Sequence, residues 1–176
     1  MEHAVSWEPP DEGWIMLQTD GAAKGCPGLA GAGGVFRDAQ GRWMVGFAEY
    51  LGRCSAVKAE LKAVFRGLRM AREMNFHKLW IRLDSKPVVE LLSSCGSGNS
   101  ECHALIHQSK QLLSWSGWEI KISHCFREAN QVADKLANLG AQEGFGLQVF
   151  QVPPRETYDA LLADCMGIAW PRRTRT

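Results

Sequence analysis

The 176-residue sequence lacks three features that would narrow its class at once. It has no apolar run long enough to cross a bilayer. Its first residues do not form a basic start followed by an apolar stretch, so we expect no secretory signal. The six cysteines form no C-x-x-C pair, which disfavours the dense disulfide framework of small secreted proteins. We therefore expect reduced thiols and an intracellular protein, either nuclear or cytoplasmic.

A strong charge of either sign is also absent, because the formal net charge is +1. This value neither requires nor excludes a polyanionic partner. The distribution is uneven, since the first twenty residues carry no Lys or Arg and the end of the chain carries Arg172, Arg173 and Arg175. One local group of metal-binding residue types has a spacing that matches no usual zinc site, so we expect no zinc there: Cys95, Cys102, His103 and His107.

Hydrophobic periodicity divides the chain into a lead-in over residues 1–13, a domain over 14–167 and a basic tail over 168–176. Strands are predicted over residues 14–20, from Gly33 onward, and over residues 42–50. The glycine-rich stretch 21–34 is predicted to form a turn between the first of these strands and the one that begins at Gly33. Asp38–Gly41 is typical of a hairpin turn before the third. These three strands should form an antiparallel meander.

The pattern then takes a helical period from Ser55, a suitable N-cap, to about Met74. The remaining predicted elements are a strand over 79–84, helices from Ser85 and over 101–113, a strand over 118–124, and helices over 130–142 and 153–164. The order β-β-β-α-β-α-α-β-α with an extra C-terminal helix predicts an α/β domain. A strand-helix-strand crossover leaves a parallel pair, so the five-stranded sheet should be mixed and flanked by helices.

Four acids fall where such a fold would gather them. Asp20 and Asp84 close strands that should be parallel neighbours, and Glu60 and Asp134 lie near the starts of helices. A lone Asp at a strand end is more often a turn or cap residue, and Glu60 on its own would be a solvated helix residue. Together they would form a pocket in which like charges disfavour ionisation unless cations bind. Hard oxygen ligands suit Mg²⁺ or Mn²⁺, and two such ions can orient a water and stabilise a leaving oxygen.

Five segments carry a family resemblance: TDGAAKG (19–25), GAGGVFRDAQG (31–41), KAELKAVFRGL (58–68), LDSKPVV (83–89) and HCFREANQVADKLA (124–137). In this order they resemble the ribonuclease H-like, reverse-transcriptase-associated domain abundant in plants. The likeness covers about residues 7–167, including W-x-P-P at Trp7–Pro10 and D-x-x-G at Asp164–Gly167.

The resemblance implies a ribonuclease H-like fold and a nucleic-acid substrate, most simply an RNA–DNA hybrid. Asp20, Glu60, Asp84 and Asp134 would hold two Mg²⁺ or Mn²⁺ ions, and His124 would help to activate water or release product. An alternative for His124 is a histidine satisfied by local contacts at a strand end. The backbone of Gly21–Gly25 would approach a sugar 2′-hydroxyl. Gly21 and Asn130 are expected to face nucleic acid, and the cations near the motifs are the candidates to contact it: Lys24, Lys86, Arg127 and Lys135.

The chain departs from classical enzymes of this family in one region. Their basic, Trp-containing protrusion corresponds here to Cys95–Cys102, which contains no Lys or Arg. The lack of these positive charges should weaken hybrid binding. The basic series Lys58, Lys62, Arg66, Arg69 and Arg72 is predicted to form a solvated helix face. Trp14, Trp43 and Trp80 fall in predicted strands and are expected in the core.

Three hypotheses follow from the sequence. The first is a metal-dependent endonuclease that cuts the RNA strand of a hybrid and leaves 3′-hydroxyl and 5′-phosphate ends. The second is a non-catalytic nucleic-acid-binding module derived from a retroelement, and the third is a protein-interaction domain. We expect a monomer with no membrane partner. The sequence leaves open whether the chain is freestanding or part of a reverse-transcriptase polyprotein.

Overall fold

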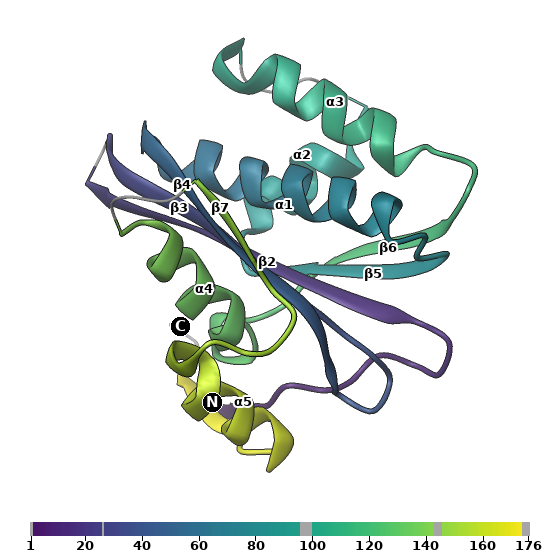
Figure 1. Cartoon of the computed structure of the whole chain (residues 1–176), viewed down its shortest axis with the longest axis vertical. Helices are drawn as coiled ribbons and strands as arrows, with labels where there is room; N and C mark the ends of the chain where they lie inside the picture. The colour runs from purple at the N-terminus through teal and green to yellow at the C-terminus, as the bar shows by residue number, and fades with distance from the viewer. Residues whose placement is uncertain (1, 26, 96–99, 143–145, 174–176) are drawn as a thin grey trace.

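The computed structural model describes residues 2–25, 27–95, 100–142 and 146–173 (Figure 1). The strands are β1 Glu2–Val5, β2 Ile15–Gly25, β3 Gly28–Arg37, β4 Trp43–Cys54, β5 Lys78–Leu83, β6 Glu119–His124, β7 Leu147–Phe150 and β8 Trp170–Arg173. The helices are α1 Ala56–Glu73, α2 Lys86–Ser93, α3 His103–Leu113, α4 Gln131–Gly140 and α5 Tyr158–Cys165, with short 3-10 turns before α3, α4 and α5. None of the described helices combines the length and hydrophobicity that a membrane span requires.

The main sheet has the strand order β6-β5-β2-β3-β4-β7. The pairs β2–β5 and β5–β6 are parallel, and β2–β3, β3–β4 and β4–β7 are antiparallel. The mixed sheet and its element order are as predicted, but the strand count of five is wrong. Leu147–Phe150 adds a sixth strand along the edge of β4. Four residues carry too little periodicity to predict a strand, and the exposed backbone of β4 supplies the pairing.

The glycine-rich stretch is not the long turn that its composition predicted. β2 continues to Gly25 and β3 starts at Gly28, so strand covers most of it. The glycines are there because helices pack closely on these strands. A Cβ added at Gly33 would lie 2.2 Å from the backbone nitrogen of Ala137 in α4, and one at Gly21 would lie 2.3 Å from that of Glu60 in α1. Close approach, rather than a turn, explains the glycines at these two positions.

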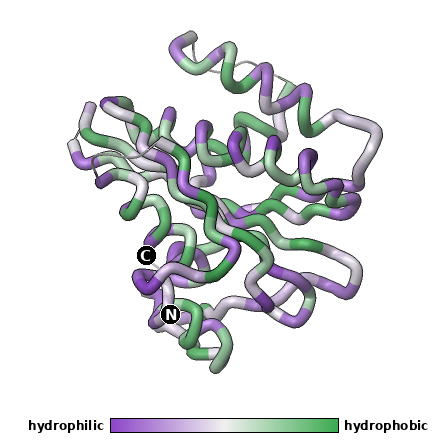
Figure 2. Tube along the Cα trace, viewed as in Figure 1, coloured by the Kyte–Doolittle hydropathy of each residue, from purple (hydrophilic) through white to green (hydrophobic). Residues whose placement is uncertain are grey.

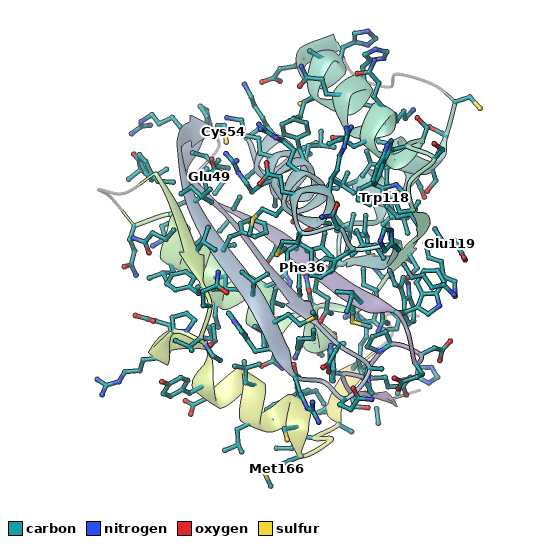
Figure 3. The ribbon with its side chains drawn as sticks, turned by 45° about the vertical axis from the view of Figure 1, so that its right-hand side comes forward. Phe36, Glu49, Cys54, Trp118, Glu119 and Met166 are labelled. Carbon is teal, nitrogen blue, oxygen red and sulfur yellow. The ribbon has the colours of Figure 1, made fainter. Side chains whose placement is uncertain are left out.

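Helices cover the sheet on both faces. α1, α2 and α3 lie on one face, and α4 with α5 lies on the other (Figure 1). The larger core cluster fills the first layer, where Phe36 packs beneath α1 (Figure 3). A smaller cluster of Val35, Val132, Leu136 and Ala160 joins α4 and α5 to the sheet. Figure 2 shows hydrophobic stretches along the central strands, as expected for a sheet buried on both sides.

The two ends of the described chain are held together. β1 pairs with β8 in a separate antiparallel sheet, with Val5 opposite Trp170 and Glu2 opposite Arg173. The first and last predicted segments therefore contact each other. The division at residues 13 and 168 remains a prediction.

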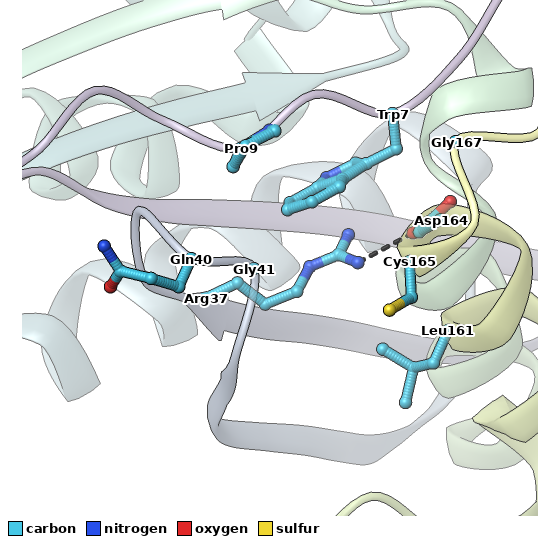
Figure 4. A pocket seen from close by; sticks show the side chains of 9 residues that line it. All are labelled: Trp7, Pro9, Arg37, Gln40, Gly41, Leu161, Asp164, Cys165 and Gly167. Atoms are coloured by element: carbon cyan, nitrogen blue, oxygen red, sulfur yellow. Dashed lines mark hydrogen bonds and ion pairs between the residues drawn. The ribbon is translucent and has the colours of Figure 1, made fainter.

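A buried polar network ties these terminal segments to the sheet (Figure 4). Arg37 is 2% exposed and donates to Asp164 at 2.7 Å, and its guanidinium lies 3.9 Å from the centre of the Trp7 ring. Arg37 and Trp7 both donate to the side-chain oxygen of Gln18 on β2. A cavity of about 290 Å³ lies beside this network. The W-x-P-P and D-x-x-G motifs thus supply the two residues, Trp7 and Asp164, that enclose Arg37.

Candidate active site

The parallel ladder between β2 and β5 determines where two of the acids lie. Its last paired residues are Thr19 and Leu83, so Asp20 and Asp84 follow the end of the ladder side by side. Asp20 does not close its strand as predicted, because β2 runs on to Gly25 paired only with β3. β5 ends at Leu83, so both acids lie just beyond the last pair of this ladder. The prediction that both acids emerge at one place in the sheet is confirmed by this register.

Glu60 reaches these two acids from the first turns of α1. Ser55 caps this helix as predicted, with its hydroxyl accepting from the Lys58 N–H at 3.3 Å. Asp20, Glu60 and Asp84 each offer a carboxylate oxygen, and these oxygens lie within 4.8 Å of one another. Glu60 Oε2 is buried and has no hydrogen-bond partner among the described residues. Three hard oxygen donors, one of them unsatisfied, fit a divalent cation of the Mg²⁺ type.

Replacing Gly21 with alanine is expected to disturb this site because α1 packs directly on the glycine. The new Cβ would meet backbone atoms of Ala59 and Glu60, which cannot move without shifting the helix. We expect a loss of roughly 1–3 kcal/mol in the free energy of unfolding. Urea denaturation measures it, with Gly146→Ala as the matched control because nothing lies within 4 Å of a Cβ there. Equal stability of the two variants would contradict the close approach.

The pKa values of the gathered carboxyl groups are raised in the metal-free protein. Burial, and then the charge of Asp84, raises the pKa of Asp20 to about 7. Burial, and then the charge of Asp20, raises the pKa of Glu60 to about 10. Burial also raises the pKa of Asp84, although a hydrogen bond from Asn130 and the charge of Arg127 oppose this shift. The pocket therefore favours either protons or cations among its carboxylates.

These shifts predict that the metal-free protein loses stability as the pH rises. A carboxyl pKa that is higher in the folded than in the unfolded state means that the folded protein binds more protons between the two values. The free energy of unfolding should therefore fall above about pH 4, through about pH 7 for Asp20 and on toward pH 10 for Glu60. Each titrating group contributes at most about 1.4 kcal/mol per pH unit.

Thermal melts in EDTA measure this dependence. We expect the melting temperature to fall between about pH 5 and pH 8, and added Mg²⁺ to restore more stability at the higher pH. In the Asp20→Asn variant the melting temperature should fall less steeply with pH up to about pH 7, where Asp20 titrates. A melting temperature that stays constant or rises over this interval would contradict the raised pKa values.

The fourth acid, Asp134, approaches from α4 on the other face of the sheet. Its charge and a side-chain hydrogen bond both act on Asp20, and its charge also acts on Asp84. The set of three mutually close oxygens does not include it. Asn130 occupies the N-cap position of α4, but its side chain makes no cap bond there. It donates instead to the carbonyl of Thr19 at 3.1 Å, which ties the start of α4 to β2 beside Asp20.

His124 lies at the end of β6, opposite Leu83 and next to the carboxylates. Burial, and then the charge of Lys86, lowers its pKa, while a hydrogen bond with Asp84 acts in the other direction. Its ring packs edge-on against Phe126, with 5.5 Å between the ring centres. The geometry thus places a histidine that favours the neutral form beside Asp84. Its catalytic role remains a prediction.

The cations predicted to face nucleic acid surround this pocket unequally. Arg127 and Lys86 are exposed, and their charges act on Asp84 and His124 respectively. Lys135 is exposed on α4 next to Asp134 in the chain. Lys24 lies further along β2, about 13 Å beyond Asp20 at the usual strand rise. Arg127 and Lys86 therefore border the carboxylates most closely.

Sequence reasoning did not identify Gln18, which connects the pocket to the terminal network. Gln18 is 1% exposed, and its amide nitrogen donates to the carbonyl of Ala129 at 2.7 Å. Ala129 precedes Asn130, so this bond fixes the turn that leads into α4. A glutamine inside a predicted strand gives no sequence signal of such a role. The cavity beside Trp7 and Arg37 belongs to this network and does not include the carboxylates.

Comparisons with known proteins agree on one family. A family model described as reverse transcriptase-like matches residues 18–140. The chain is 38% identical over 175 residues to an Arabidopsis thaliana protein named "Putative ribonuclease H protein", a match that covers 99% of this chain and 28% of that protein. The chain therefore spans less than a third of the length of this plant relative.

Two solved structures share the architecture. The crystal structure of RNase H1 from the halophilic archaeon Halobacterium salinarum is similar with a TM-score of 0.67 and 28% identity, covering 72% of this chain and 96% of that one. The crystal structure of LC11-RNase H1 in complex with an RNA/DNA hybrid has a TM-score of 0.67 and 24% identity over the same shares, a likeness of fold alone. These structures confirm the predicted fold class.

Proposed function

Because the chain belongs to the reverse transcriptase-like family and has the fold of ribonuclease H1, we propose that it hydrolyses the RNA strand of RNA–DNA hybrids. The observation that carries this proposal is the meeting of Asp20, Glu60 and Asp84 oxygens within 4.8 Å of one another. Acids from two strands and a helix are brought together here although their burial disfavours their charged forms. Such a cost is typical of functional sites that bind cations.

We propose that Asp20, Glu60 and Asp84, joined by Asp134 from α4, hold two Mg²⁺ or Mn²⁺ ions. The unpartnered oxygen of Glu60 and the all-oxygen donor set fit this assignment. Two divalent ions, when bound, orient the attacking water and stabilise the leaving oxygen of a phosphodiester. Asn130 makes a hydrogen bond to Asp84 and another to the Thr19 carbonyl, and these bonds support a position of α4 beside Asp20 and Asp84.

His124 supplies a proton carrier at the border of this pocket. Its lowered pKa favours the neutral imidazole, so it can accept a proton from the attacking water and then pass that proton to the leaving 3′-oxygen. The exposed cations Arg127 and Lys86 lie where they can pair with phosphates on either side of the cleaved bond. Residues 21–25 of β2 pair with β3 on one side and have no strand partner among the described residues on the other, because the pairing with β5 ends at Thr19. This edge is available to a ribose 2′-hydroxyl.

The decisive experiment is cleavage of a short end-labelled RNA–DNA hybrid by the wild-type chain. We expect cleavage of the RNA strand with Mg²⁺ or Mn²⁺, products with 3′-hydroxyl and 5′-phosphate ends, and no cleavage in EDTA. Double-stranded DNA and double-stranded RNA of the same sequence are the matched substrates and should remain intact. Cleavage that persists in EDTA, or that prefers duplex DNA, would exclude this function.

A second candidate is a module that binds hybrids without cleaving them. The observation that favours it is the absence of Lys and Arg from Cys95–Cys102, where the classical enzymes carry their basic protrusion. Residues 96–99 of this segment lie outside the described residues. Hybrid binding in a mobility-shift assay, with no turnover across Mg²⁺, Mn²⁺ and a range of salt concentrations, would support this alternative.

A further inference from the structure

The half of the sheet formed by β5 and β6 has one face without a helical cover. Leu79, Ile81 and Leu83 of β5 point into the core beneath α1 and α2. The alternate residues Lys78, Trp80 and Arg82 therefore point to the opposite face. On that face α4 packs on β2, β3 and β4, whereas α2, the described helix that contacts both β5 and β6, lies on the opposite face with α1 (Figure 1). Figure 3 shows Glu119, at the start of β6, on the exposed margin of the molecule.

Aromatic rings and cations alternate on this open face, which we call the β5–β6 face and define by Trp14, Lys78, Trp80, Arg82 and Lys121. The Lys121 ammonium lies 4.2 Å from the centre of the Trp14 ring and 6.0 Å from that of Trp80. The Arg82 guanidinium lies 5.0 Å from the Trp80 ring centre, and the Lys78 ammonium lies 5.9 Å from that of Trp14. The expectation that Trp14 and Trp80 belong to the core is wrong, because both are half-buried on this face.

The charge of the β5–β6 face is positive. Glu119 lies 3.8 Å from Lys78, and both side chains are largely exposed, which makes this a weak pair. Arg82 and Lys121 have no ion-pair partner among the described residues. The Nε–H of Arg82 is buried and donates no hydrogen bond to any described residue. The face thus presents more cationic groups than the protein itself neutralises.

The β5–β6 face is continuous with the candidate active site. Strand register places Trp80 between Met16 and Lys121, and Arg82 between Gln18 and Ser123. Asp84 follows Arg82 by two residues, directly after the end of β5. The face therefore extends from the carboxylates down the sheet for about 20 Å, from Asp84 back to Lys78.

We propose that the β5–β6 face binds single-stranded nucleic acid that continues from the catalytic pocket. Cations spaced between indole rings on a flat sheet match a strand whose phosphates and unpaired bases are both accessible. A duplex would hide its base faces from the two tryptophans, and an acidic peptide would leave them without a stacking partner. This inference rests on the proposed function for the kind of polymer, and it adds a site for an unpaired extension of the hybrid.

The test measures binding of a fluorescent oligo-deoxythymidine of about 12 nucleotides, a length within known single-strand site sizes. Anisotropy is recorded in EDTA, so that the result does not depend on cleavage. Lys78→Ala combined with Lys121→Ala should weaken binding about tenfold. The plot of the logarithm of the binding constant against the logarithm of the salt concentration should also become shallower by about 1.4, the value for two lost single-strand phosphate contacts. An abasic oligonucleotide of the same length should also bind the wild-type chain several-fold more weakly.

The matched control is Lys62→Ala combined with Arg69→Ala, which removes two charges from α1 on the other side of the sheet. It should leave the affinity unchanged. The proposal is overturned by a wild-type chain that does not bind the oligonucleotide, by equal losses in the two double variants, or by equal affinity for the abasic strand. Competition by polyglutamate as strong as by the oligonucleotide would overturn it in favour of an acidic peptide. Because cleavage of a blunt hybrid is measured separately, either proposal can fail while the other stands.

Discussion

Asp20→Asn is expected to abolish metal-dependent cleavage of an RNA–DNA hybrid and to stabilise the metal-free protein. Asp20 is 7% exposed and lies among Glu60, Asp84 and Asp134, so its charge contributes both to ion binding and to repulsion. The neutral amide keeps an oxygen that can accept the Gly21 N–H, a bond of 2.9 Å in the wild-type chain. The fold should therefore persist while the ion site is lost.

We expect the cleavage rate to fall at least about a thousandfold, which corresponds to roughly 4 kcal/mol of activation free energy. In EDTA at about pH 8 the melting temperature should rise by roughly 3–6 °C, since one buried like charge is removed. Single-turnover cleavage and calorimetric melts measure the two effects. Asp159→Asn, an exposed acid on α5, is the control and should change neither. If the Asp20→Asn variant cleaved the hybrid at the wild-type rate, the nuclease assignment would be wrong.

Arg37→Met is expected to cause the largest loss of stability of any single change considered. Arg37 and Asp164 are almost fully buried, and burial lowers the pKa of Arg37 and raises that of Asp164. Each charge is therefore maintained by its partner. Removing the guanidinium leaves the Asp164 carboxylate without its counter-charge, and such unpaired buried charges cost about 3–5 kcal/mol. Trp7 and Gln18 also lose a contact each.

Urea denaturation of Arg37→Met should show this loss, with Arg155→Met on the exposed surface as the control. The combined variant Arg37→Met with Asp164→Leu should recover part of the stability, because both buried charges are then absent. A double variant less stable than Arg37→Met would contradict this explanation. A loss below about 1 kcal/mol for the single variant would show that the network holds the terminal segments only weakly.

The terminal network also bears on the active site. Arg37 donates to Gln18, Gln18 donates to the carbonyl of Ala129, and the next residue, Asn130, bonds to both Thr19 and Asp84. A continuous set of hydrogen bonds therefore leads from the paired chain ends to the carboxylates. In this chain the segments outside the family match at residues 18–140 contribute to holding the site in place.

Several elements could be read from the sequence because their physical causes are local. The helical period after Ser55 and its cap predicted α1, and the change of period at Leu79 predicted β5. The crossover between strands required a parallel pair, and this requirement predicted Asp20 beside Asp84, as the ladder between β2 and β5 has them. Motif order added the family and the identity of the four acids. Local periodicity and chain connectivity were sufficient for the fold class, whereas the choice of the four acids also needed the motifs.

Other features depended on contacts between distant segments. Glycine composition alone predicted a turn over residues 21–34, whereas the structure uses Gly21 and Gly33 to admit α1 and α4. Trp80 is apolar and lies in a strand, so its place on an open face rather than in the core depended on which strands α4 covers. Nothing near Arg37 in the sequence indicates Asp164 or Trp7. By itself, then, the sequence determined the helices and the five central strands, though not β1, β7 or β8, because hydrogen bonding and hydrophobic period act over a few residues. It also indicated that Asp20, Glu60 and Asp84 would meet. Only the tertiary structure decided what covers each face and which buried charges pair, because burial is a property of all the segments packed together.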